Sequence, residues 1–182
     1  MEPTSGTARG HDRRLTQLRG RALGYQRSTL SAPGRCRAPE GWAESVQTTD
    51  LGDGVELFDT AADDLLGLTA HTRAGIRIVE ADPDVPEDID ILDGPMRGPC
   101  RLVDRVDESL RQGLVLGTLE GNLAVAEHRC HVDLDPDTGA VTATIRTTWR
   151  PRSAYLLPGA ARREERAFQR LGEKLVRALG GR

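Results

Sequence analysis

The chain has 182 residues, of which 37% are apolar and 20 are glycine, a composition typical of globular proteins. Lysine and arginine number 25 against 28 acids, which gives a formal net charge of −3. No apolar run reaches the roughly 18 residues of a membrane span, so no membrane-spanning segment is expected. Cys36, Cys100 and Cys130 show no CxxC spacing, which argues against a disulfide scaffold or a zinc ribbon. We therefore expect a reduced, cytoplasmic protein.

The charge is unevenly distributed along the chain. Residues 40–98 carry fifteen acids against three arginines, whereas both ends of the chain are basic. A nucleic-acid site would require a strongly basic domain with stacking aromatic residues, and the chain has only two Trp, two Tyr and two Phe. We expect the basic ends to lie against the acidic middle within one fold, and no nucleic-acid partner.

Residues 1–12 are small and polar and are predicted to form a disordered lead-in. Residues 13–182 are predicted to form a single domain. It begins with a short helix over 13–23, followed by a loop and a first strand over 42–49.

Apolar residues then recur at helical spacing and predict a helix over 54–70. Asp53 precedes Glu56 by three residues, the spacing of a capping box, so Asp53 is the predicted N-cap. His71 follows this helix directly and is interpreted as a charge that complements the C-terminal end of the helix dipole.

The pattern changes to period two after this helix, which predicts short strands. Their connections are too short for parallel crossovers, so the strands must pair antiparallel. The predicted strands cover 76–79, 88–91, 99–106, 113–119, 124–134 and 141–146.

A long amphipathic helix is predicted over 159–179, with Phe168, Leu171, Leu175 and Leu179 forming its apolar stripe. A curved antiparallel sheet is apolar on one face and needs a cover, which this helix can supply. The predicted class is α+β, a curved antiparallel sheet of about six or seven strands gripping a long C-terminal helix. This element order is similar to the helix-grip fold of START-like lipid-transfer proteins and of the birch-pollen-allergen family, and implies a cavity between sheet and helix.

The densest group of potential metal ligands is the run from Glu127 to His131. On a strand, His128 and Cys130 face one side, whereas Glu127 and His131 face the other. Three or four zinc ligands do not converge from this local spacing. We therefore predict no metal site and no cofactor, and place Cys130 in the core.

Four segments together resemble the bacterial and plant family called domain of unknown function 1990. The resemblance covers about residues 14–180. Its motifs are LGDGVELFDTAADDLL at 51–66, GPCRLV at 98–103, GLVLGTLEGNLAVAEHRCHV at 113–132 and WRP at 149–151. The resemblance implies no particular reaction, because the family has no established activity.

The sequence also departs from the family pattern at several positions. A tyrosine, a His-Pro pair, a second glutamate, an aromatic residue and a helix tryptophan are replaced. The corresponding residues are Leu116, Asn122-Leu123, His128, Cys130 and Leu68. Because the replaced groups include those suited to acid–base chemistry, a binding role is favoured over a shared reaction.

The leading hypothesis is that the domain binds a small, mostly apolar molecule between the sheet and the C-terminal helix. Such pockets contain a few polar groups that orient the ligand. The candidates are Arg101, Thr118, Glu127 and Arg146, with Trp149 at the cavity mouth or in the core. No catalytic residue is assigned.

Two alternatives remain open. The first is a START-like cyclase- or hydrolase-type enzyme that uses a buried Glu127 as general base. It requires two titratable groups to converge inside the pocket. The second is a non-enzymatic interaction or structural protein with a closed core. A dry pocket above about 300 Å³ would favour binding, and the absence of a pocket would favour this second alternative.

Overall fold

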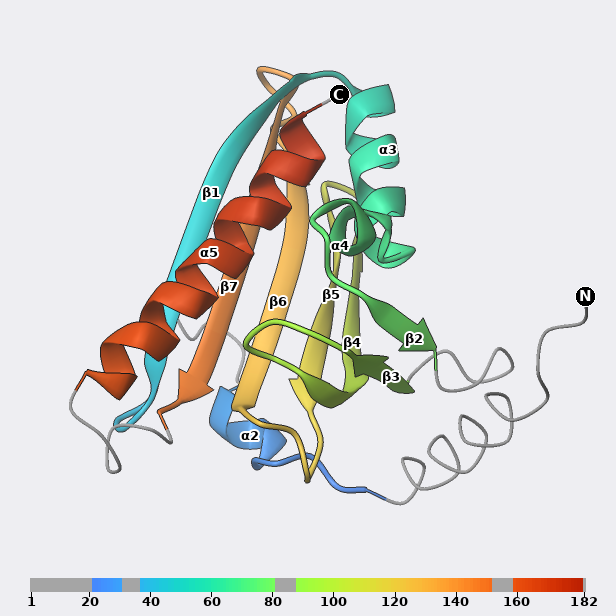
Figure 1. Cartoon of the computed structure of the whole chain (residues 1–182). Helices are drawn as coiled ribbons and strands as arrows, with labels where there is room; N and C mark the ends of the chain where they lie inside the picture. Colours follow the sequence, from blue (N-terminus) through green and yellow to red (C-terminus); the bar gives the residue numbers. More distant parts are fainter. Residues whose placement is uncertain (1–20, 31–36, 81–87, 152–158, 182) are drawn as a thin grey trace, which may run out of the picture.

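The central element is a curved sheet of seven antiparallel strands in the order β1-β7-β6-β5-β4-β3-β2 (Figure 1). The computed structural model describes residues 21–30, 37–80, 88–151 and 159–181. The strands are β1 (Ala43–Asp53), β2 (Ile78–Glu80), β3 (Asp88–Ile91), β4 (Gly98–Glu108), β5 (Arg111–Thr118), β6 (Val125–Leu134) and β7 (Ala140–Arg150).

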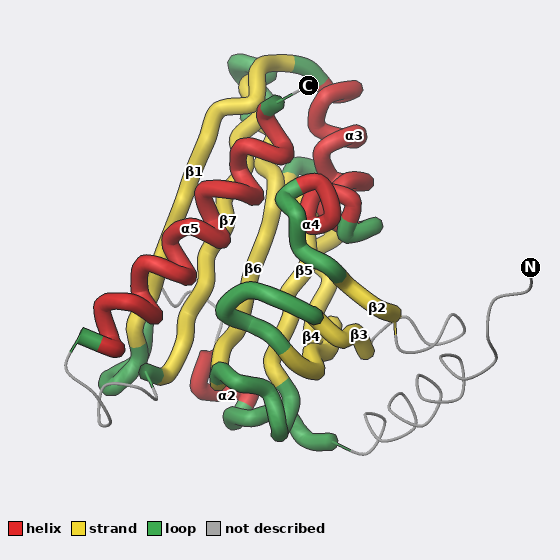
Figure 2. The backbone as a smooth tube through the Cα atoms, in the orientation of Figure 1, coloured by secondary structure: helices red, strands yellow, loops and turns green. Residues whose placement is uncertain are grey.

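The described helices are α2 (Arg27–Leu30), α3 (Val55–Leu66), α4 (Thr69–Arg73) and α5 (Ala160–Gly180). Three of them, α3, α4 and α5, cover one face of this sheet, as the tube in Figure 2 shows. The long α5 packs on β1 and β7, whereas α3 packs on β5 and β6 and α4 contacts both α3 and α5. Among the described helices, none combines the length and apolar character needed to cross a membrane.

The predicted fold class is confirmed. The sheet has seven antiparallel strands, and the C-terminal helix lies across its concave side in a helix-grip arrangement. The helix predicted over 159–179 is α5, and the strand predicted over 42–49 is the first part of β1. The expected lead-in, residues 1–12, and most of the helix expected over 13–23 lie outside the described residues.

The prediction of a single helix over 54–70 is wrong in two respects. It is divided into α3 and α4, with Gly67 and Leu68 between them. In addition, Asp53 is not its cap: the N-cap position is Gly54, and no side chain caps the helix. The physical reason is that β1 continues to Asp53, which pairs with Ala140, so this residue is held in the sheet.

The two faces of the sheet differ because side chains alternate along each strand. The inner face, covered by α3, α4 and α5, carries buried side chains of the core. On β6 and β7 these include Ala126, Cys130, Val132, Ala143, Ile145 and Trp149. The outer face carries the residues between them, among which are Glu127, Arg129 and Arg146.

An aromatic stack fastens α5 to the inner face. The rings of Trp149 and Phe168 have centroids 4.4 Å apart and planes inclined by 23°. Farther along α5, a side chain at Gly172 would collide with Gln47 of β1, because an added Cβ would lie 2.0 Å from its Oε1. The helix therefore lies tightly against β1 and β7.

Removing this stack should loosen the α5 contact. We expect Phe168→Ala to lower the free energy of unfolding by about 3–5 kcal/mol, the usual range for deleting a buried aromatic ring. Leu123→Ala is the matched control, since Leu123 is 67% exposed and should change stability by less than about 0.5 kcal/mol. Urea unfolding followed by circular dichroism measures both, and equal effects would contradict the assignment of the stack as the anchor.

Candidate functional site

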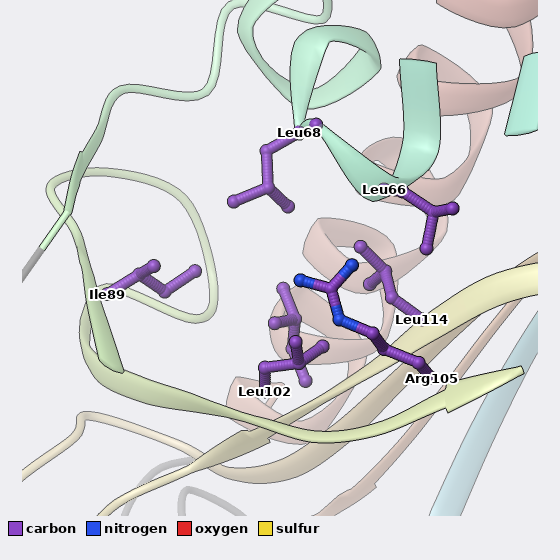
Figure 3. A pocket seen from close by; sticks show the side chains of 8 residues that line it. Leu66, Leu68, Ile89, Leu102, Arg105 and Leu114 are labelled. Carbon is purple, nitrogen blue, oxygen red and sulfur yellow. The ribbon is translucent and has the colours of Figure 1, made fainter. Parts of the chain in front are cut away.

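A pocket opens on the inner face beneath the turn that joins α3 to α4 (Figure 3). Its volume is about 70 Å³. The lining is apolar except for one guanidinium and comes from α3, the turn, β3, β4 and β5. The residues are Leu66, Gly67, Leu68, Ile89, Leu102, Arg105, Leu114 and Leu116.

A β-bulge in β4 places Arg105 in this pocket. Leu102 pairs with Leu116, but the register then shifts, so that Arg105 pairs with Leu114. An extra residue in one strand reverses the alternation of the residues that follow. Leu102 and Arg105, three positions apart, therefore face the same side although a regular strand would separate them.

The Arg105 guanidinium is the one charged group of the pocket lining. Figure 3 shows it extending from β4 toward the turn that carries Leu66 and Leu68. The side chain is exposed and forms no ion pair within the described residues. It is therefore free to contact a negatively charged group at the opening.

The roof of the pocket contains an unusual backbone conformation. Leu68 has φ of 57° and ψ of 13°, in the left-handed region that residues with a bulky side chain seldom occupy. This conformation costs roughly 1–2 kcal/mol. The backbone amide of Leu68 donates to the carbonyl of Leu65, and its carbonyl accepts from the amide of Thr72, so both helices hold it in place.

The five residues proposed from the sequence do not line this pocket. Two lie on the inner face: Thr118 is buried and exchanges hydrogen bonds with the backbone of Ala126, and Trp149 stacks beneath α5. The other three belong to the outer face and do not converge on this pocket. Arg101 makes a bidentate ion pair with Asp88 and Arg146 lies 3.4 Å from Glu44.

Glu127, the third, is bound on the outer face by the segment preceding α2. The Tyr25 hydroxyl donates to its Oε2 at 2.9 Å, and Arg129 lies 3.6 Å from its Oε1. Burial and the adjacent Glu127 raise the pKa of Tyr25. The strand alternation separates Glu127 from the pocket, so the structure does not place it as a general base there.

A second group of side chains with potential ligand atoms lies between α4 and β6. The side chains of His71, His128 and Cys130 are fully buried, and one donor atom of each lies within 4.8 Å of the others. Cys130 Sγ is 3.0 Å from His128 Nε2, and His128 Nδ1 is 2.7 Å from the Thr147 hydroxyl. Neither ring nitrogen of His71 has a hydrogen-bond partner among the described residues.

This position of His71 corrects its interpretation as a dipole-stabilising cation. Burial lowers the pKa of His71 to about 4, and burial together with His71 lowers the pKa of His128 to about 3. Both imidazoles are therefore neutral near pH 7. Local spacing could not predict this group, because α4 contributes one member and β6 the other two.

The curved antiparallel sheet and the long α5 that packs across it define a helix-grip protein. The chain belongs to the family described as Domain of unknown function (DUF1990), whose profile matches residues 24–178. This match confirms the resemblance found in the sequence motifs. Leu68 and Leu116, two of the positions where the sequence departs from the family pattern, both line the pocket. No curated protein sequence matches the chain significantly.

The chain is similar to several solved structures at low sequence identity. A hypothetical protein from Helicobacter pylori superposes with a TM-score of 0.53 at 9% identity, over 88% of this chain and 95% of that chain. The di-domain ARO/CYC StfQ from the steffimycin biosynthetic pathway gives 0.49 at 16%, over 77% and 50%. Ara h 8.0201 gives 0.47 at 13%, over 78% and 97%. At these identities the similarity concerns the fold alone.

The neutral buried histidines predict a pH dependence of stability. In the unfolded chain each titrates near pH 6.5, whereas the folded pKa values are about 4 and 3. The unfolded state therefore binds more protons below pH 6.5. Each histidine therefore makes its full contribution to the free energy of unfolding above pH 6.5. As the pH falls toward 4, this contribution decreases by about 1.4 kcal/mol per histidine and pH unit.

Urea unfolding between pH 7 and 5 in metal-free buffer tests this dependence. In His71→Gln one of the two histidines is removed, so the difference in slope from the parent should approach about 1.4 kcal/mol per pH unit near pH 5. Because other titrating groups are common to both proteins, they cancel in the comparison. Parallel pH curves for variant and parent would contradict the prediction.

Proposed function

We propose that the protein binds a small, mostly apolar molecule bearing one negatively charged group in the pocket beneath the α3–α4 turn. The observation that carries this proposal is the lining itself, in which leucine and isoleucine side chains surround a single guanidinium, that of Arg105. Ligand sites are typically apolar with a few polar groups that fix orientation. Arg105 would bind a carboxylate or similar anion at the opening while the apolar part of the ligand enters.

The pocket does not lie where the sequence suggested. The sequence predicts a cavity between the sheet and the C-terminal helix, whereas this pocket lies beside α5, which packs on β1 and β7 through the Trp149–Phe168 stack and Gly172. The pocket instead occupies the part of the sheet that α5 leaves uncovered, above β3, β4 and β5. The turn at Gly67 and Leu68 forms its cover.

The volume limits the size of the ligand. A single water requires roughly 10–15 Å³ by the same measure, so about 70 Å³ accommodates about five waters or a comparably small organic group. Common ligand sites measure about 300–1,000 Å³. A larger ligand would have to displace the turn, and Leu68, with its strained backbone, is where such a movement would begin.

A binding role fits the pocket better than catalysis does. Arg105 is the one titratable residue among those that line it, and an arginine side chain does not give up its proton in proteins. The reaction proposed as an alternative needs a general base, and Glu127 lies on the opposite face, bound to Tyr25.

The proposal can be tested by methyl NMR with straight-chain carboxylates from butyrate to octanoate as probes. In protein with labelled leucine methyls, addition of a probe should shift the signals of Leu66, Leu68, Leu102, Leu114 and Leu116. Leu175, buried on the sheet-facing side of α5, and the exposed Leu123 serve as internal references and should not move. Shifts confined to other leucines, or no shifts up to millimolar probe, would contradict the proposed site.

Arg105→Gln tests the charged contact. We expect carboxylate binding to weaken about fivefold, since an exposed ion pair contributes up to about 1 kcal/mol. Binding of the uncharged primary alcohols of equal length should change little. Arg162→Gln is the matched control, because Arg162 is an exposed arginine on α5, away from the pocket. Equal weakening by both variants, or of acids and alcohols alike, would show that Arg105 does not contact the ligand.

A further inference from the structure

The group formed by His71, His128 and Cys130 is a site separate from the pocket. His71 belongs to α4, whereas His128 and Cys130 are alternate residues on the inner face of β6. Their donor atoms lie within 4.8 Å of one another, close enough for a single ion to contact all three. We propose that these three side chains bind one thiophilic metal ion.

The unpaired state of His71 is the observation that points to a ligand. Its side chain is 1% exposed, yet neither ring nitrogen has a hydrogen-bond partner among the described residues. Buried polar side chains nearly always have a partner. A metal ion bound between His71 and the His128–Cys130 pair would supply it, because a neutral imidazole nitrogen is a good metal ligand.

The surroundings of His128 are those of a metal ligand held in one orientation. The Thr147 hydroxyl lies 2.7 Å from Nδ1, on the ring edge opposite Cys130. With the proton on Nδ1 donated to Thr147, the lone pair of Nε2 is directed at the group that includes Cys130 Sγ. Metal-bound histidines commonly have such an outer partner on the second nitrogen.

The donor set selects the type of ion. One thiolate and two imidazoles suit copper and zinc, whereas calcium and magnesium require oxygen ligands. Binding replaces the thiol proton of Cys130, which leaves to solvent, and no electron is transferred. With monovalent copper the thiolate makes the site neutral, but with divalent zinc one positive charge remains. Because uncompensated charge is costly in an apolar interior, monovalent copper is favoured over zinc.

The site is too enclosed for a substrate. A cavity of about 10 Å³ adjoins it, lined in part by His71, His128 and Met96, with room for about one water. Cys130 is 0% exposed, and burial raises its pKa, so a nucleophilic thiolate paired with His128 is not favoured. The arrangement suits an ion that is stored or that stabilises the fold, independently of the pocket ligand.

Metal titration of the full-length chain tests the proposal. The protein is prepared reduced and oxygen-free in a Cys36→Ser background and titrated separately with Cu⁺, Zn²⁺ and, as a spectroscopic probe, Co²⁺. We expect one equivalent of copper to remain bound after desalting, tighter binding of Cu⁺ than of Zn²⁺, and a thiolate-to-cobalt charge-transfer absorption. The melting temperature should rise with bound metal, because the unfolded chain lacks the assembled site.

Three variants assign the ligands. Cys130→Ser and His71→Gln should each weaken Cu⁺ binding at least about tenfold and alter the cobalt spectrum. Cys100→Ser is the matched control, since Cys100 is equally buried, on β4, and outside the group. If Cys130→Ser does not fold, His71→Gln still decides, because the His71 ring nitrogens have no hydrogen bond to lose among the residues that the structure describes. Absence of one-equivalent binding of Cu⁺ and Zn²⁺, or parent-like binding by His71→Gln, would overturn the proposal.

Discussion

The strict alternation of side chains along β6 and β7 is the constraint on which the rest of the structure depends. The two strands pair over nearly their whole length, with Ala126 opposite Trp149 and Cys130 opposite Ile145. This register puts Ala126, Cys130 and Val132 of β6 on the same face as Ala143, Ile145 and Trp149 of β7. That apolar face must be covered, and α5 covers part of it through the stack of Phe168 on Trp149. The same alternation directs Glu127 and Arg146 outward, away from the pocket beneath the α3–α4 turn.

The pocket exists because the covering of the inner face is incomplete. A single helix spans β1 and β7, so the far half of the sheet depends on the shorter α3 and α4. The turn between them crosses above β4 and β5 with a leucine in a left-handed conformation. Beneath it, the bulge in β4 brings Arg105 to the inner side. A mostly apolar space with one positive charge at its opening follows from these two local irregularities.

The buried histidines and cysteine lie where α4 joins the helices α3 and α5 that cover the inner face. The short α4 contacts both α3 and α5, and it inserts His71 between them and β6. Burial keeps both imidazoles neutral, which is costly below pH 6.5 but leaves their nitrogens available as ligands. On the outer face, by contrast, charged residues are paired: Arg101 with Asp88, and Glu127 with Arg129 and Tyr25. These ion pairs therefore lie on the outer face of the sheet, whereas the neutral imidazoles lie on its inner face.

The sequence by itself determined the fold class, because alternation within strands and the apolar stripe of residues 159–179 are local patterns that each element carries alone. The family motifs were recognisable in the sequence because each is a continuous run of residues. Tertiary structure alone decided the sites. A bulge reverses alternation without a local signal, which is why Arg105 was not predicted. His71 and His128 are distant in the chain, and only the packing of α4 on β6 brings them together. Spacing within one helix or strand indicates which of its residues share a face. It does not indicate which residues of another helix or strand pack against that face.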